Sequence, residues 1–452
     1  MTEPAPLMVN AYDGSRAGDL PAATRELLGR RERALAGAYR LLYDQPVSFA
    51  RGAGVFLYDA DGHAYLDAYN DVPSVGHSHP HVTETVSRQL ATLNTHTGYL
   101  ADAIISYAER LLATHTLNTG TGNTGTGGPV AGSAAGQAMF TCTGSEANDL
   151  ALRIARQHTG GTGVIVTANA YHGGTAALAE VSPSLGPGVP LGPHVRVVPA
   201  PAPGVNFTTA VAWAISDLER HGLRLAAFLA DSLFSSDGVL PDPAGFLAPV
   251  AEIVRASGGL YIADEVQSGF GRTGTHLWGY QRHGITPDIV TMGKPMGNGL
   301  PIAGLVARPD VLEGFGRQAR YFNTFGGNPV CVAAASAVLD VLEAEALPAN
   351  AAATGSYLKD AVTRLAEGSP GLGDVRGAGL YLGIDVIAPG TAGEPSGELA
   401  SAIVNGMRER RVLVGATGPL GNVLKVRPPL PFAREHADQF LTVLAEVLDA
   451  LT

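Results

Sequence analysis

Short apolar runs alternate with longer, helix-like stretches from Ala138 to about Leu305. A strand, a helix and a further strand in succession predict a right-handed crossover and a mostly parallel sheet. Nearly continuous apolarity within each run fits strands that are buried on both faces. The pattern therefore predicts an α/β domain around a mostly parallel, seven-stranded sheet, with strands at Ala138–Thr141, Gly163–Thr167, Val195–Val198, Leu225–Ala230, Gly259–Ala263, Ile289–Thr291 and Ile302–Val306.

The N-terminal part of the chain has a different pattern. Residues 20–45 predict a helix rich in Arg and Leu, and residues 82–113 predict two helical pieces. Between them, Gly54–Tyr69 predicts a hairpin, because Asp61-Gly62 is a strong turn signal. Leu117–Gln137 is a Gly/Thr/Ala tract without periodicity, which we expect to be a surface insertion, and no function is assigned to it.

The C-terminal part predicts a smaller α+β domain. A long helix of Ala, Val and Leu follows Asn328-Pro329, and the runs Leu380–Val386 and Val423–Val426 predict strands with helices between them. The N-terminal hairpin is expected to join this domain. We therefore expect a small domain formed by residues 1–80 and 336–452, and a large domain formed by residues 81–335.

The composition describes a folded protein with a large core. The 452 residues are 45% hydrophobic and 16% charged, which argues against a disordered chain and leaves room for two domains. A net charge of −11 without a basic stripe argues against nucleic acid as a partner. The N-terminus lacks the pattern of a secretory signal, and no apolar run reaches about 18 residues, so we expect a cytoplasmic protein without a membrane span. Cys142 and Cys331 have no CxxC spacing and predict neither a disulfide framework nor a zinc site.

Lysine is rare in this chain, and arginine carries most of the positive charge. The three lysines are Lys294, Lys359 and Lys425. A bias from lysine to arginine should spare positions that need a primary amine, because an amine can form a Schiff base and a guanidinium group cannot. Lys294 lies in the glycine-rich turn Thr291–Gly299, directly after an apolar run. This position predicts a catalytic amine.

A second candidate, Thr143-Gly-Ser-Glu-Ala-Asn148, follows a predicted strand and opens a predicted helix. Gly144 allows close approach of a ligand, and Ser145 adds a hydroxyl group. Free N–H groups and the helix dipole favour a phosphate at such a place. Taken alone, the motif is more typical of an ordinary strand-to-helix turn with a capping residue.

Asp264 ends the buried strand that precedes Lys294. A carboxylate at this position can cap the next element, or it can keep the nitrogen of a pyridine ring protonated. Asp264 and Lys294 are 30 residues apart, at the ends of successive strands. Because the carboxyl ends of neighbouring strands share a crevice in open α/β sheets, we expect both side chains to meet there.

Two histidine-containing motifs leave alternatives open. Tyr171-His172-Gly-Gly174 follows the predicted strand Gly163–Thr167, so Tyr171 could stack on a flat cofactor or simply pack. His77 and His79 are spaced as i, i+2 and lack a third ligand, which makes a metal site there improbable.

The order and spacing of these motifs strongly resemble the class III aminotransferase family, whose members are pyridoxal 5′-phosphate (PLP) enzymes of fold type I. The resemblance extends from about residue 40 to the end of the chain. It implies that Lys294 is the Schiff-base lysine and that Asp264 is the partner of the pyridine nitrogen. It further implies a homodimer with a shared active site, in which Thr324 contacts the cofactor phosphate of the neighbouring subunit. The other implied cofactor contacts are Gly144, Ser145, Tyr171, His172, Val266 and Gln267.

One departure from the family concerns the side that binds the substrate. Amino-acid aminotransferases of this class usually have an Arg three residues before the C-terminal Pro428-Pro429, where it binds the substrate's α-carboxylate. This chain has Lys425 there. An ammonium group supplies a point charge in place of the guanidinium fork. Arg427 lies in the same extended segment, and a shift in register would restore an arginine.

A second departure follows Leu225–Ala230, where many members have Glu-Pro-(Val/Ile)-Gln-Gly and this chain has Asp231–Gly238. Both departures resemble the phospho-lyase branch of the family, which acts on O-phosphoethanolamine or 5-phosphohydroxylysine. The resemblance implies a lyase that releases phosphate, ammonia and an aldehyde. An ω-aminotransferase is the alternative, and a PLP-binding protein without catalysis fits Lys294 and Asp264 less well. The candidates for binding the substrate phosphate are Lys425, Arg427 and His77.

Overall fold

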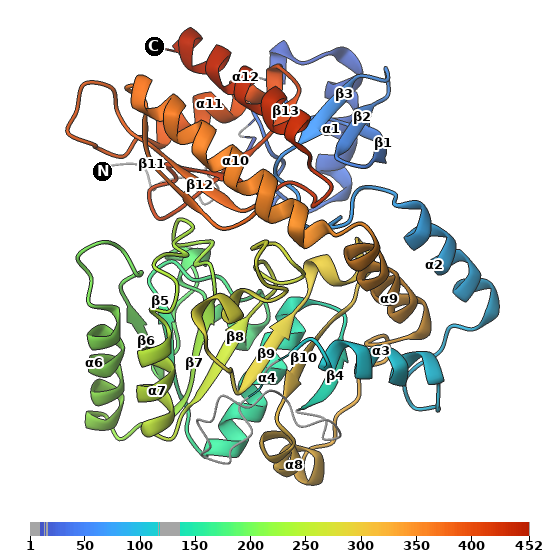
Figure 1. The fold of residues 1–452 in the computed structure, drawn as a ribbon, viewed down its shortest axis with the longest axis vertical. Coiled ribbons are helices and arrows are strands. Elements are labelled where there is room, and N and C mark those ends of the chain that lie inside the picture. Colours follow the sequence, from blue (N-terminus) through green and yellow to red (C-terminus); the bar gives the residue numbers. More distant parts are fainter. Residues whose placement is uncertain (1–9, 13, 15–16, 116, 118–135, 452) are drawn as a thin grey trace.

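The computed structural model describes residues 10–12, 14, 17–115, 117 and 136–451. Its largest element is a seven-stranded sheet in the order β4-β10-β9-β8-β7-β5-β6 (Figure 1). The strand β10 runs antiparallel to both of its neighbours, and the remaining pairs are parallel. The strands are β4 (Gln137–Thr141), β5 (Gly163–Thr167), β6 (Val195–Val198), β7 (Leu225–Asp231), β8 (Leu260–Asp264), β9 (Ile289–Met292) and β10 (Ala303–Ala307).

Residues along the central strands alternate between two hydrophobic clusters, one on each face of the sheet. Phe228 and Tyr261 contribute to the first cluster, together with helices α6, α7 and α9. Leu229 and Ile262 contribute to the second, together with helices α4 and α8. The sheet is therefore buried on both faces, as the apolar runs predict. The bounds are α4 (Gly144–Thr159), α6 (Phe207–Arg220), α7 (Ala248–Ala256), α8 (Pro309–Gln318) and α9 (Pro329–Ala344); the short α5 is Ala176–Ala179.

A smaller α+β part is built from both ends of the chain. One sheet has the order β1-β2-β3-β13, in which the C-terminal β13 pairs in parallel with the N-terminal β3, and a second has the order β11-β12-β15-β14. The strands are β1 (Phe49–Ala53), β2 (Phe56–Asp59), β3 (Ala64–Asp67), β11 (Leu372–Gly377), β12 (Leu382–Val386), β13 (Val412–Leu413), β14 (Gly415–Thr417) and β15 (Val423–Val426). The helices are α1 (Ala22–Ala34), α10 (Leu347–Gly368), α11 (Gly397–Glu409) and α12 (Arg434–Leu451).

The sequence predictions hold best where the apolar runs are longest. All seven strands of the large sheet are confirmed, as is the hairpin β2–β3. The helix predicted over residues 20–45 ends at Ala34, because Leu35 is extended (φ −119°, ψ 142°) and Leu42 forms a bridge with Ala11 instead. The strands β1, β11, β13 and β14 are not anticipated. They are short or glycine-containing and carry little periodic signal.

The helices α2 (Pro80–Thr92) and α3 (Asp102–Leu112) confirm the two pieces predicted over residues 82–113, and both pack against α9 (Figure 1). The predicted boundary between residues 335 and 336 falls inside α9. Most of the predicted Gly/Thr insertion, Leu117–Gln137, lies outside the described residues. Within the described residues, no helix is both long enough and apolar enough to cross a membrane.

Candidate active site

A cavity of about 330 Å³ lies at the carboxyl ends of β8 and β9. Asp264 is the last residue of β8, and Lys294 follows β9 by two residues, so the crossover topology brings the two side chains to one edge of the sheet. The structure thus places both predicted catalytic residues in one crevice. The lining residues include Gly144, Ser145, Asn148, Tyr171, His172, Asp231, Asp264, Val266, Gln267 and Lys294.

The Asp264 carboxylate is buried and oriented by hydrogen bonds. Its Oδ2 accepts from Asn148 Nδ2 at 2.9 Å and is bonded to His172 Nδ1 at 2.7 Å. Its Oδ1 accepts from the Val266 backbone N–H at 3.1 Å. Asn148 is fixed in turn, because its Oδ1 accepts from Thr291 Oγ1 at 2.6 Å. Within the described residues Asp264 Oδ1 accepts one hydrogen bond, so it can accept another from a ligand in the cavity.

Asn148 and Thr291 are functional residues that sequence reasoning missed. Asn148 ends the Thr143–Asn148 motif, but nothing in the sequence indicates that it faces Asp264. His172 was predicted as a cofactor contact, and the structure shows it lining the cavity and orienting Asp264. Its contact with a cofactor stays a prediction.

The neighbouring Glu265 anchors this loop. Its carboxylate accepts from Ser232 Oγ at 2.5 Å and Ser268 Oγ at 2.8 Å, and from the backbone N–H groups of Gly279 at 2.6 Å and Tyr280 at 2.8 Å. Burial raises the pKa of Glu265 to about 7, although these hydrogen bonds oppose the rise. Four donors around one carboxylate hold the chain rigid directly after Asp264.

The Lys294 turn is fixed by the segment Ser74–Gly76 from the small part of the molecule. Ser74 Oγ donates to the Pro295 carbonyl at 3.1 Å. Asn298 Oδ1 accepts from the Val75 N–H at 3.1 Å, and Asn298 Nδ2 donates to the Gly76 carbonyl at 2.9 Å. Two motifs that are more than 200 residues apart therefore meet at the turn that carries Lys294, the predicted catalytic amine.

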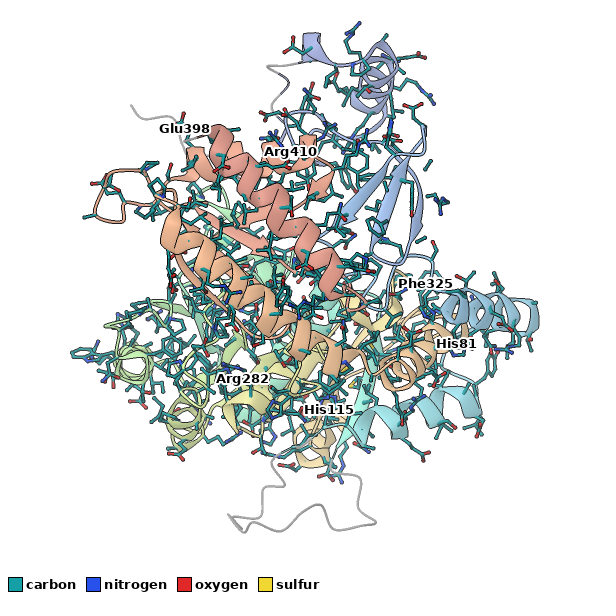
Figure 2. All side chains as sticks on the ribbon, turned by 45° about the horizontal axis from the view of Figure 1, so that its top comes forward. His81, His115, Arg282, Phe325, Glu398 and Arg410 are labelled. Carbon is teal, nitrogen blue, oxygen red and sulfur yellow. The ribbon has the colours of Figure 1, made fainter. Side chains whose placement is uncertain are left out.

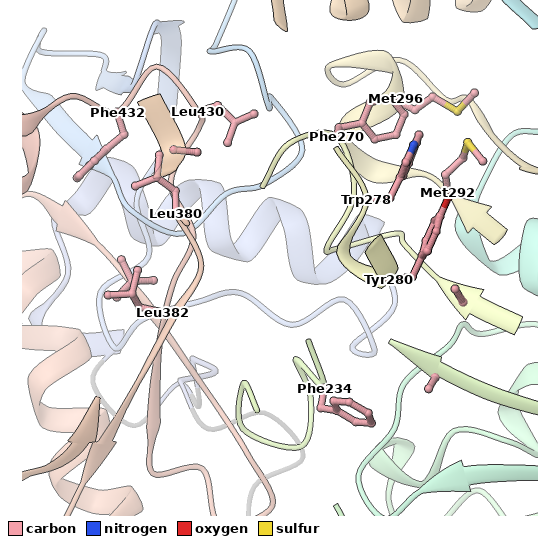
Figure 3. Packing of buried hydrophobic residues seen from close by; sticks show 14 of the residues in the cluster. Phe234, Phe270, Trp278, Tyr280, Met292, Met296, Leu380, Leu382, Leu430 and Phe432 are labelled. Carbon is pink, nitrogen blue, oxygen red and sulfur yellow. The ribbon is translucent and has the colours of Figure 1, made fainter. Parts of the chain in front are cut away.

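Buried aromatic and sulfur-containing side chains pack around the Lys294 turn. Figure 3 shows Met292 and Met296 beside Phe270, Trp278 and Tyr280. The rings of Phe270 and Trp278 meet edge to face with their centres 4.9 Å apart. This packing fixes the backbone on both sides of Lys294.

The Thr143–Glu146 turn has the shape of a phosphate-binding helix start. Thr143 Oγ1 accepts from the Glu146 N–H at 3.1 Å, and Glu146 Oε2 accepts from the Thr143 N–H at 2.9 Å, which forms a capping box. A Cβ at Gly144 would lie 2.9 Å from Val266 Cγ2, so only glycine fits. Ser145 Oγ accepts from the Gly174 N–H at 3.1 Å, which joins this turn to the Tyr171–Gly174 motif. Helix N–H groups without intrahelical partners therefore face the cavity.

These residues fit PLP. Tyr171 lines the cavity with 41% of its surface exposed, and Val266 lines it as well, so a flat ring has an aromatic and an aliphatic residue available to it. Asp264 can accept from a ring nitrogen, Lys294 supplies the amine, and the turn that starts at Thr143 supplies N–H groups for a phosphate. The N–H groups match the phosphate of this cofactor, the primary amine matches its aldehyde, and the carboxylate matches its ring nitrogen.

The predicted substrate-binding residues are not brought together. His77 is bonded through Nε2 to Asp67 Oδ2 at 2.7 Å and does not line the cavity. Arg427 lies behind Gln267, because its Nη1 donates to Gln267 Oε1 at 2.7 Å. Lys425 is on β15 and is buried. Neither of these two cations lines the cavity directly, although Gln267 does.

In the segment Asp231–Gly238, the carboxylate of Asp231 accepts hydrogen bonds from the backbone of its own loop. Asp231 Oδ1 accepts from the Leu233 N–H, and Oδ2 accepts from the Ser235 N–H, both at 2.9 Å. Burial raises the pKa of Asp231; the hydrogen bond from Ser235 opposes this rise, and the Asp264 carboxylate adds to it. Asp231 lines the cavity but is engaged with its own loop. Each of its two oxygens accepts one hydrogen bond from the loop that follows β7.

Thr324 does not line the cavity of its own chain and is exposed. The nearby Phe322 and Phe325 are 64% and 69% exposed. Figure 2 shows Phe325 on the side of the molecule where α2 lies. The role of Thr324 at the cavity of a neighbouring subunit stays a prediction.

The architecture and the site define an α/β enzyme of PLP fold type I. The family described as aminotransferase class-III matches residues 42–448. The chain therefore belongs to the class III aminotransferase family, as its motifs predict.

Three similar proteins bear on its activity. "Alanine--glyoxylate aminotransferase 2-like" of Drosophila melanogaster is 37% identical over 447 residues, which cover 94% of this chain and 87% of that protein. "Ethanolamine-phosphate phospho-lyase homolog 1" of Caenorhabditis elegans is 35% identical and covers 94% of this chain and 93% of its own length. The solved structure of a phospholyase from Arthrobacter in complex with phosphoethanolamine is 44% identical, with a TM-score of 0.87, and covers 94% of this chain and 100% of its own.

Proposed function

We propose that this chain is a PLP-dependent phospho-lyase that acts on a phosphorylated amine such as O-phosphoethanolamine. The observation that carries the proposal is Lys425, which stands where the family's amino-acid aminotransferases have a carboxylate-binding arginine. The segment Asp231–Gly238 supports it, because it stands where many members of the family have Glu-Pro-(Val/Ile)-Gln-Gly. The 44% identity to a phospholyase solved with phosphoethanolamine points the same way.

The reaction is an elimination followed by hydrolysis. A C–H bond breaks at the carbon that bears nitrogen, and a C–O bond breaks at the adjacent carbon. The phosphate leaves with the electron pair of the C–O bond. One water molecule is then consumed, so that the substrate yields phosphate, ammonia and an aldehyde. No second substrate and no oxidant are needed.

Bound PLP supplies an electron sink next to the C–H bond that breaks. The Ser74–Gly76 contacts hold the turn of Lys294 at the edge of the cavity. From there the Lys294 amine removes the proton from this carbon. Asp264 holds a proton at the ring nitrogen, with its orientation fixed by Asn148 and His172. Tyr171 and Val266 line the cavity and would contact the ring of the bound cofactor.

Incubation with O-phosphoethanolamine in the absence of a keto acid tests the proposal, and inorganic phosphate is the readout. Stoichiometric release of phosphate and aldehyde is expected. The alternative is an ω-aminotransferase, which the 37% identity to an alanine–glyoxylate aminotransferase 2-like protein favours. Absence of phosphate release from O-phosphoethanolamine and phosphohydroxylysine, together with turnover of an ω-amine plus pyruvate, would establish that alternative.

The active form is proposed to be a homodimer in which Thr324 contacts the cofactor phosphate bound by the partner. The support is that Thr324 is exposed and lies outside its own cavity, beside exposed phenylalanines. Size-exclusion chromatography with light scattering is expected to give twice the chain mass. Thr324→Ala is expected to weaken cofactor binding, and a fully active monomer would contradict the proposal.

A further inference from the structure

A second, much smaller cavity lies beside the cofactor cavity, at the carboxyl ends of β5 and β7. Its volume is about 10 Å³, and one water molecule needs about 10–15 Å³. Thr167, His172 and Asp237 line it and are only 3%, 4% and 8% exposed. His172 lines the cofactor cavity as well, whereas Asp264 lines the cofactor cavity alone. The small cavity is therefore an internal space on the side of His172 that faces away from Asp264.

The imidazole of His172 presents one nitrogen to each side. Its Nδ1 is bonded to Asp264 Oδ2 at 2.7 Å. The two nitrogens of an imidazole point in nearly opposite directions, so Nε2 faces the small cavity. Within the described residues, His172 Nε2 is buried and has no hydrogen-bond partner. A buried polar atom without a partner is costly, so this nitrogen requires a polar neighbour in the small cavity.

Asp237 supplies a carboxylate to the same small cavity. Its Oδ2 accepts from Thr167 Oγ1 at 2.5 Å, and its Oδ1 accepts from the Asn169 N–H at 2.8 Å. A carboxylate has about four acceptor sites, so Asp237 can accept a further hydrogen bond. Because His172 Nε2 has no partner among the described residues, a group of about one water in size is needed to connect it with this carboxylate.

The electrostatics favour Asp237 over the other carboxylate at this cavity, which is Asp231. Burial raises the pKa of Asp237; the hydrogen bonds from Thr167 and Asn169 oppose the rise, and so does the charge of His172. For Asp231 the corresponding influences are burial, its own loop and Asp264. Both Asp231 oxygens also accept from the backbone of that loop. His172 is therefore coupled to Asp237 on one side and to Asp264 on the other.

We propose that one water molecule occupies the small cavity and joins His172 Nε2 to the Asp237 carboxylate, so that Asp237 is a positioning residue that acts on Asp264 through this water and His172. An ionised carboxylate only accepts hydrogen bonds, so the water donates one hydrogen to Asp237. Its second hydrogen is donated to Nε2 of a neutral ring, and its oxygen accepts from the N–H of a charged ring. The water thus serves both states of the imidazole.

The bridge would fix the His172 ring from the side opposite to Asp264. An imidazole that is held at both nitrogens cannot turn without breaking a buried hydrogen bond, so its Nδ1–H stays directed at Asp264 Oδ2. The inference rests on the proposed PLP chemistry at Asp264 and does not depend on which substrate is used. It adds Asp237, which lies outside the cofactor cavity, to the residues that determine the rate.

Nitrogen-15 NMR of the PLP-loaded, histidine-labelled enzyme tests the coupling without substrate. The signal of His172 is identified by its loss in His172→Gln and is followed between about pH 5 and pH 9. Asp237→Asn keeps the size of the side chain and removes the anion that favours the charged ring. It is expected to lower the midpoint of the His172 titration by about one pH unit.

Kinetics and a crystal structure test the positioning role and the water. In Asp237→Asn, kcat for the substrate that the wild type turns over should fall about tenfold with KM nearly unchanged. A high-resolution crystal structure of the wild type should show one water within hydrogen-bond distance of His172 Nε2 and Asp237. Asp385→Asn is the matched control, because Asp385 pairs with Arg376 at 2.7 Å, lines neither cavity and should change neither kcat nor the titration.

An unchanged His172 titration or an unchanged kcat in folded Asp237→Asn overturns the inference, and so does a crystal structure without a water in the small cavity. If Asp237→Asn does not fold, the wild-type crystal structure decides by itself. A wild-type enzyme that releases no phosphate from O-phosphoethanolamine refutes the proposed phospho-lyase function, whereas the titration and the crystal structure need no substrate and still decide the role of Asp237.

Discussion

The two sides of the active site hold their polar groups in different ways. On the cofactor side, Asp264 has three hydrogen-bond partners, and one of these, Asn148, is itself fixed by Thr291. On the substrate side, Lys425 has no partner among the described residues, and Arg427 is paired with an internal acid. A saturated network fixes geometry for one cofactor, whereas an unpaired buried cation favours whichever anion fits. Under the proposed function, the comparison predicts that geometry selects the cofactor and charge selects the substrate.

The largest effect is expected from Lys294→Ala. Loss of the amine removes both the covalent attachment of the cofactor and the base, so phosphate release should fall by about 10⁴-fold or more. The visible absorption band that the cofactor acquires when it is joined to Lys294 should also disappear. Lys359→Ala is the control, because Lys359 lies on α10 and does not line the cavity. An unchanged spectrum in Lys294→Ala would refute the assignment.

Asp264→Asn should have the next largest effect. An amide cannot hold a proton on the ring nitrogen, so kcat should fall by about 10³-fold while the protein stays folded. Asp374→Asn, at an exposed ion pair with Arg376, should retain wild-type rates. Steady-state kinetics with O-phosphoethanolamine measures both variants. If Asp264→Asn keeps its kcat, the cofactor side is not organised around this carboxylate.

The pH dependence of substrate binding tests the substrate side of the site, where Lys425 lies. Burial first, and the Arg427 charge next, lower the pKa of Lys425 to about 7, so its amine loses its proton as the pH rises through this value. The KM for the phosphorylated amine should therefore rise about tenfold between pH 6 and pH 8 because of this group. Lys425→Met should lose this component, while Lys359→Met should keep it. Identical profiles for the two variants would show that Lys425 plays no part.

The smallest effect is expected at the helix cap. Thr143→Ala removes the cap of α4 and should lower the free energy of unfolding by about 1 kcal/mol. Ser396→Ala removes the equivalent cap of α11 and should cost a similar amount. Cofactor affinity should weaken in Thr143→Ala and stay unchanged in Ser396→Ala, because α4 begins at the cavity and α11 does not. Equal affinities would place the cofactor phosphate elsewhere.

The sequence predicts the cofactor side well for a physical reason. Buried parallel strands leave long apolar runs, and the functional residues follow these runs directly, as Asp264 and Lys294 do. The helix over residues 20–45 was predicted too long because Arg and Leu residues continue after Ala34, and β11 was missed because Gly373 and Gly377 interrupt its pattern. Gly377 is required there, since a Cβ would lie 2.3 Å from the Tyr381 carbonyl oxygen.

The sequence by itself therefore determined the α/β sheet, the family and the meeting of Asp264 and Lys294 in one crevice, because local periodicity and motif spacing encode them. Only the tertiary structure decided the partners of Arg427 and the isolation of Lys425. Asp71 and Arg427 are separated by more than 350 residues, and ionic contact between them depends on how β15 packs against the segment after β3. Burial and the resulting shifts in pKa arise from that packing, so no pattern along the chain reveals them.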